Sequence, residues 1–144
     1  MISDVASLPF FHRSYPAGLL ADEPPGTACA AVQAVEGADF VLLVAEPTPF
    51  GLHDLHLAVG MLRSLGRRHG VVVNRADEGT PSLRHYCATE GLDILMEIPD
   101  DRRIATACSR GEMMIDELPE YVPAFLELLE QVKGKLDAES RLGA

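Results

Sequence analysis

From residue 17 onward, short apolar runs alternate with stretches in which apolar residues recur at helical spacing. The runs 40–44, 70–73 and 94–98 are rich in Val, Ile and Leu, as expected for strands covered on both faces, and 17–21 is a further short run. Helical patterns follow in 29–35, 52–66, 80–91 and 100–111. This alternation predicts an α/β domain: a parallel, Rossmann-like sheet with right-handed crossovers and helices on both faces.

The two ends of the chain lie outside this alternating pattern. Residues 1–16 show no clear period and are predicted to be irregular, whereas 117–141 carry an apolar stripe typical of a C-terminal helix. Because of Pro119 and Pro123, the sequence does not define the residue at which that helix begins. The length suits one domain, so we expect 1–144 to form a single α/β unit.

The composition limits the classes of partner. The formal net charge is −10, which disfavours nucleic acid and anionic lipid as partners. No apolar run is long enough to cross a bilayer, and no signal-peptide pattern follows Met1, so we expect a cytoplasmic protein. The widely spaced Cys29, Cys87 and Cys108 are expected to be free thiols that pack as small hydrophobes, with Cys29 near a helix start where a thiolate is favoured.

Polar, turn-forming residues follow each predicted strand: Asp22-Glu23, Glu46-Pro47, Asn74-Arg75 and Pro99-Asp100. The carboxyl ends of parallel strands share one edge of a sheet, where ligands of such folds bind, so one crevice can collect these residues. Pro24-Pro25-Gly26 after Asp22 suits a phosphate and metal turn, because Gly lets backbone N–H groups approach an anion. A plain strand-to-helix turn with a capping acid explains the same residues, and Glu46 alone fits a loop acid without a catalytic role.

Four motifs in order resemble the later half of the MinD/ParA-type P-loop ATPases, and most closely the branch with an inserted ferredoxin-like domain. They lie within residues 19–125 and read Asp22-x-Pro-Pro-Gly-Thr-x-Cys29, Val44-Ala-Glu-Pro-Thr-Pro-Phe-Gly-Leu-His-Asp-Leu55, Val72-Val-Asn-Arg75 and Glu97-Ile-Pro-Asp-Asp-Arg102.

The resemblance implies roles for individual residues. Asp22 resembles the switch acid that holds a water on Mg²⁺, and Gly26 resembles the switch glycine near the γ-phosphate. Asn74 resembles the residue whose amide reads the adenine edge, and Arg75 neighbours that base. Pro99 and Asp100 look like the loop that closes over adenine and ribose. The implied cofactor is ATP or ADP with Mg²⁺, bound weakly or not at all by this chain alone.

The sequence departs from this family at the phosphate-binding loop. It contains no Gly-x-x-x-x-Gly-Lys-Ser/Thr, and its one Gly-Lys pair, Gly134-Lys135, lies in the predicted last helix. The mid-sheet strand that carries this loop in the family, and the cysteine-rich insert, are missing as well. Because the loop supplies most of the phosphate contacts, we do not expect ATP hydrolysis by this chain alone. The sheet gap would close by direct pairing of 17–21 with 40–44, by insertion of 1–11, or by a strand from a second chain.

Two functional hypotheses follow. The first is an incomplete or degenerate MinD/ParA-type nucleotide-binding domain that acts through association, as a homo-oligomer or with a P-loop-bearing partner chain. The alternative is half or a fragment of an ATPase that handles iron–sulfur or metallocofactor assembly, with the P-loop supplied by another chain or by upstream sequence. A gene start upstream with an in-frame P-loop would favour the alternative.

Smaller groups of residues carry weaker signals. His53 and His56 could share a helix face as metal ligands, but no third ligand is near in sequence and a solvated face explains them. Arg102, Arg103 and Arg110 could reach phosphate, although surface pairing with nearby acids is the simpler interpretation.

Overall fold

The computed structural model describes residues 14–15, 18–19, 32, 35 and 37–140. Its centre is a three-stranded parallel sheet in the order β3 (Val41–Ala45), β4 (His69–Ala76) and β5 (Ile94–Pro99). Helix α2 (Pro49–Ser64) connects β3 to β4, and α3 (Thr80–Glu90) connects β4 to β5. The predicted α/β class and the parallel sheet are therefore confirmed.

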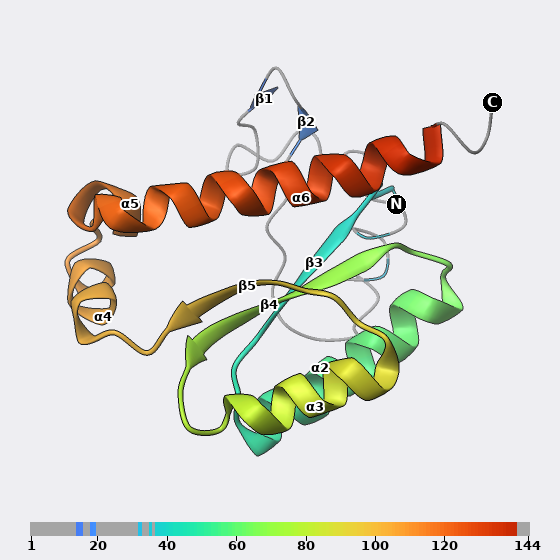
Figure 1. The fold of residues 1–144 in the computed structure, drawn as a ribbon, viewed down its shortest axis with the longest axis horizontal. Helices are drawn as coiled ribbons and strands as arrows, with labels where there is room; N and C mark the ends of the chain where they lie inside the picture. Colours follow the sequence, from blue (N-terminus) through green and yellow to red (C-terminus); the bar gives the residue numbers. More distant parts are fainter. Residues whose placement is uncertain (1–13, 16–17, 20–31, 33–34, 36, 141–144) are drawn as a thin grey trace, which may run out of the picture.

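Helices cover both faces of this sheet (Figure 1). Helices α2 and α3 share one face, where their apolar residues form a buried cluster with the sheet. The cluster contains Ala45, Leu55, Val59, Val71, Val73, Leu83 and Cys87. Helix α6 (Val122–Ser140) crosses the opposite face, and the Gln131 side-chain amide donates to the Leu95 carbonyl at 3.2 Å. Residues 70–73 of strand β4 are buried on both faces because helices pack on both sides of the sheet, and its two edges pair with β3 and β5.

Local sequence explains most helix boundaries. Thr48 caps α2 by accepting from the Gly51 N–H at 3.0 Å, with Pro49 in the first turn. Asp101 caps α4 (Arg102–Ser109) by accepting from the Arg103 N–H at 2.8 Å. Helix α3 begins at Thr80, and the Thr80 hydroxyl accepts from the Asp77 N–H. The cap position is Gly79, which has no side chain to accept from the first turn.

The C-terminal helix predicted over 117–141 is divided. Helix α5 (Met114–Glu117) is followed by the 3₁₀ turn η2 (Pro119–Tyr121), and α6 begins only at Val122. The two prolines explain the break, because each lacks an N–H and fits only a first turn. Within residues 14–15, 18–19, 32, 35 and 37–140, no helix is long and apolar enough to cross a membrane.

The N-terminal prediction is corrected in part. Gly18–Leu19, from the predicted strand 17–21, forms β2, which pairs antiparallel with β1 (Ser14–Tyr15) and does not join the parallel sheet. Ser14 and Tyr15, predicted to be irregular, are thus in a strand. Only two residues separate Tyr15 from Gly18, and that separation favours hairpin pairing. Among the described residues β3 has a neighbouring strand on one side only, and direct pairing of Leu19 with β3 is not seen.

Candidate functional site

The carboxyl ends of the three parallel strands bring Glu46, Arg75 and Asp100 together. The Arg75 Nη1 lies 3.7 Å from Glu46 Oε2, and its Nε donates to Asp100 Oδ1 at 3.4 Å. All three side chains are more than two-fifths exposed, so these ion pairs contribute little to stability. These contacts matter for the site because they bring together residues from three separate strand ends at one edge of the sheet.

The backbone at the end of β4 is unusual. Arg75 has a φ of 55°, the only positive φ of a non-glycine residue in the described parts of the chain. This left-handed conformation costs roughly 1–2 kcal/mol for a residue with a side chain. The strand ladder is irregular here, with a register shift between Val73 and Ala76, and the Asp100 N–H donates to the Ala76 carbonyl at 3.0 Å. Strained backbone held by its surroundings is a frequent mark of a functional site.

Close backbone packing holds together the loops at this edge of the sheet. A Cβ added to Gly51 would lie 2.3 Å from the Glu46 carbonyl oxygen, and one added to Gly79 would lie 2.2 Å from the Pro47 oxygen. The β3–α2 loop therefore packs against the first turn of α2 at Gly51 and against the β4–α3 loop at Gly79, where only glycine fits. Asp77 tightens the second loop by accepting from the Gly79 N–H at 2.7 Å. The edge is thus built on closely packed loops.

A second polar group lies directly after β5. Asp101 accepts from the Arg103 backbone and guanidinium and from the Tyr121 hydroxyl, and Arg103 also donates to Glu120 at 2.8 Å. The hydrogen bonds from Arg103 lower the pKa of Asp101 from 3.8 to about 2. These contacts join the start of α4 to η2, the turn directly before α6. They also show Arg103 in surface pairing, and Arg110 lies 3.9 Å from Glu112, as the simpler interpretation of these arginines expects.

The structure places four of the six predicted site residues. Asn74 is half-buried at the end of β4 beside Arg75, and exposed Pro99 ends β5 next to Asp100, so all four share the carboxyl edge. Asp22 and Gly26 lie outside the described residues. The roles of all six in binding nucleotide or Mg²⁺ stay predictions.

Sequence reasoning undervalued two acids. Glu46 contacts Arg75, and its position at a strand end on the ligand edge was the available signal. Asp101 pairs with Arg103, as the interpretation of these arginines as surface pairs expects, but its role as the N-cap of α4 was not predicted. His56, considered as a metal ligand, lies against Tyr86, whose hydroxyl is 3.3 Å from its Nδ1. In the part of the chain that the structure describes, no three potential ligands gather for a metal.

Comparison with solved structures identifies the fold. The MinD cell division protein of Aquifex aeolicus superposes with a TM-score of 0.57 and 23% identity, over 70% of this chain and 46% of that one. The matched part has the MinD fold.

Sequence comparison finds similarity to an archaeal protein. The uncharacterized protein MJ0579 of Methanocaldococcus jannaschii is 31% identical over 105 residues, which is 72% of this chain and 36% of that protein. The chain thus spans about a third of this relative and under half of the MinD structure. No protein-family model matches the sequence.

Proposed function

We propose that this chain is an incomplete MinD-type nucleotide-binding domain. It recognises the base of an adenine nucleotide weakly at the carboxyl edge of the sheet, does not hydrolyse ATP alone and acts through association with another chain. The observation that carries this proposal is the meeting of Glu46, Arg75 and Asp100 at the ends of three parallel strands in a MinD fold.

The retained groups suit a base and a ribose better than phosphates. Asn74 offers an amide that both donates and accepts, which matches the edge of adenine. Pro99 gives a flat apolar cover, and Asp100 can accept from ribose hydroxyls. The carboxylates of Glu46 and Asp100 would repel phosphate groups, and Arg75 is the cation that offsets them. Asp22 would hold Mg²⁺ through water only where phosphates are gripped by a loop that these 144 residues do not contain.

Isothermal titration with AMP, ADP and Mg-ATP tests base recognition. Binding through the base predicts similar, roughly millimolar affinities for the three nucleotides, because their shared part makes the contacts. Arg75→Ala should weaken binding, whereas Arg84→Ala should not. Arg84 is the matched control because it is also more than half exposed and also pairs with an acid, Glu97.

Two results of the nucleotide titration would contradict the proposal, each in a different part. Micromolar Mg-ATP binding with turnover by this chain alone would show that the missing loop is not needed, and the proposal would fail. If no nucleotide binds at all, base recognition is wrong and only association remains.

Exposed apolar surface on β3 supports association. Leu43 and Ala45 pack with the α2–α3 cluster, so Val44 points to the other face of the sheet, where its side chain is 66% exposed. A strand of a parallel sheet is ordinarily covered on both faces, so this position suits contact with a second chain. A second copy of this chain or a chain bearing a P-loop would cover it.

Sedimentation velocity tests which of the two applies. Self-association predicts a concentration-dependent dimer that Val44→Lys weakens. Leu57→Lys, on the outer face of α2 where Leu57 is 46% exposed, should leave it unchanged. A monomer at every concentration would exclude the homo-oligomer and leave a P-loop-bearing chain as the partner, to be tested by co-expression.

A further inference from the structure

Strand β3 lies at one side of the parallel sheet, and its backbone is hydrogen-bonded toward β4. The Val41 N–H donates to the Arg68 carbonyl at 2.9 Å, and the register with β4 is regular from Val41 to Ala45. Successive residues of a strand direct their N–H and C=O groups to opposite sides. The backbone groups of Leu42 and Val44 therefore point away from β4, and in the part of the chain that the structure describes no second strand pairs with them.

The strand at the other side of the sheet, β5, is covered. Helix α6 packs against β5, and the Gln131 side-chain amide donates to the Leu95 carbonyl at 3.2 Å (Figure 1). Strand β3 contains no charged residue, no proline and no bulge against β4, which are the features by which exposed edge strands ordinarily avoid pairing. The outer edge of β3 is therefore suited to pairing with a further strand.

A second copy of β3 satisfies the outward backbone groups in one antiparallel register. When the two strands are centred on Leu43, Leu42 of each copy lies directly opposite Val44 of the other. Opposite residues in an antiparallel pair exchange both backbone hydrogen bonds when their groups face each other, as those of Leu42 and Val44 do here. Opposite residues also share a face of the sheet, so the exposed Val44 side chain meets Leu42 of the second copy.

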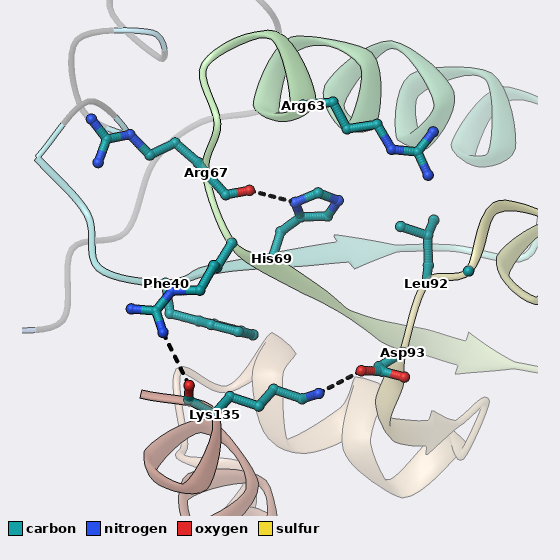
Figure 2. A pocket seen from close by; sticks show the side chains of 9 residues that line it. Phe40, Arg63, Arg67, His69, Leu92, Asp93 and Lys135 are labelled. Atoms are coloured by element: carbon teal, nitrogen blue, oxygen red, sulfur yellow. Dashed lines mark hydrogen bonds and ion pairs between the residues drawn. The ribbon is translucent and has the colours of Figure 1, made fainter. Parts of the chain in front are cut away.

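Positive charge predominates at the amino end of β3. Arg67 and Arg68 directly precede β4 there, and Asp39 is the acid in the segment before β3. The Lys135 ammonium also lies at this end, but it pairs with Asp93 and adds no net charge. Figure 2 shows the Arg67 guanidinium well apart from that ion pair. The two arginines thus outnumber the acid.

Negative charge predominates at the carboxyl end. The acids that follow the strands here are Glu46, Asp77 and Asp100, and the cation between the first and the last is Arg75. An antiparallel pair places the positive end of each strand beside the negative end of the other, whereas a parallel pair places like charges together. Two-fold symmetry between identical chains gives the antiparallel pair and lets one surface serve both copies. Charge therefore favours a second copy of this chain as the partner.

We propose that two copies of this chain pair antiparallel through the outer edge of β3, so that one sheet continues across both. The inference rests on the association in the proposed function and specifies its surface and its partner. The candidate nucleotide residues lie at the strand ends and not along this edge. Pairing and nucleotide binding are therefore tested separately.

Sedimentation velocity over a range of protein concentrations tests the pairing. Val44→Pro removes an N–H that points outward and no hydrogen bond to β4, and proline is tolerated on the open side of an edge strand. We expect it to raise the dissociation constant of the dimer by roughly tenfold or more, because each copy loses a hydrogen bond. Val44→Ala is the matched control: it shortens the same side chain but keeps the N–H, so its effect should be much smaller.

Hydrogen exchange followed by NMR tests the same contact in the unchanged chain. The Leu43 amide points to β4 and should be protected at every concentration. The amides of Leu42 and Val44 should be protected only at concentrations where the dimer forms, because the second copy supplies their acceptors.

A monomer at every concentration would overturn the pairing, while the proposed nucleotide function would stand with a different chain as partner. A dimer that Val44→Pro and Val44→Ala weaken equally would associate through another surface and would also overturn it. The same holds if the Leu42 and Val44 amides of the dimer exchange as fast as those of the monomer. Absence of nucleotide binding would instead contradict the proposed function and leave the pairing intact. Far-UV circular dichroism checks that each variant is folded, and if Val44→Pro is not, the exchange experiment decides.

Discussion

Two glycines in helix α2 should respond in opposite ways to the same substitution. A Cβ at Gly60 would meet nothing within 4 Å, whereas one at Gly51 would lie 2.3 Å from the Glu46 carbonyl oxygen and 3.1 Å from its carbon. Sequence-based propensity treats the two positions alike and favours alanine at both, by about 1 kcal/mol. The structure predicts that Gly60→Ala stabilises the protein and Gly51→Ala destabilises it.

The magnitude follows from the contact at Gly51. To reach an ordinary carbon–oxygen distance, the backbone at residue 51 and the Glu46 carbonyl would have to separate by about 1 Å. Side-chain rotation cannot relieve this contact, because the Glu46 oxygen belongs to the backbone and a Cβ is attached directly to the backbone. Overpacking of this kind costs about 1–3 kcal/mol, and we expect the upper part of that range. Because both variants share the propensity gain, the difference between their free energies of unfolding measures the clash alone.

Urea denaturation followed by far-UV circular dichroism measures this difference. With an m-value of about 2 kcal/mol/M, the two midpoints should differ by about 1 M, with wild type between them. Equal m-values would confirm that the comparison concerns stability and not the compactness of either state. If Gly51→Ala is as stable as Gly60→Ala, the close contact between the first turn of α2 and Glu46, at the end of β3, would be refuted.

Three other predictions test separate parts of the structure. Arg75→Gly should be more stable than Arg75→Ala by about 1 kcal/mol in urea denaturation, because only glycine relieves a φ of 55°; equal stability would argue against the left-handed backbone. Because the pKa of Asp101 is lowered to about 2, its contribution to stability should be complete above its unfolded pKa near 3.8 and be lost as the pH falls toward 2. Arg103→Gln should raise that pKa in an NMR titration, and an unchanged value would refute the pairing. Exposed Cys108 should react with a thiol reagent in the native protein, whereas Cys87, whose pKa burial raises, should react only after unfolding, as peptide mass spectrometry would show.

Local sequence was sufficient for the central α/β unit. The apolar runs predicted β3, β4 and β5 to within a few residues, because strands of a parallel sheet are buried on both faces and show it in their composition. Helix ends were predicted where a single residue controls the backbone, as at Gly91, which has a φ of 66°. The rule that ligand residues follow parallel strands placed Asn74, Arg75, Pro99 and Asp100 on one edge, and the structure has them there.

Tertiary structure decided what depends on residues distant in sequence. The pairing of Gly18–Leu19 with Ser14–Tyr15 could not be predicted from an apolar run, because such a run indicates a strand but not the strand with which it pairs. The contact of Arg75 with Glu46 and the role of Asp101 at the start of α4 also needed coordinates, as did the clash that forbids a side chain at Gly51. Sequence fixes local conformation through burial and backbone preference, whereas the meeting of distant side chains follows only from the packing of the whole chain.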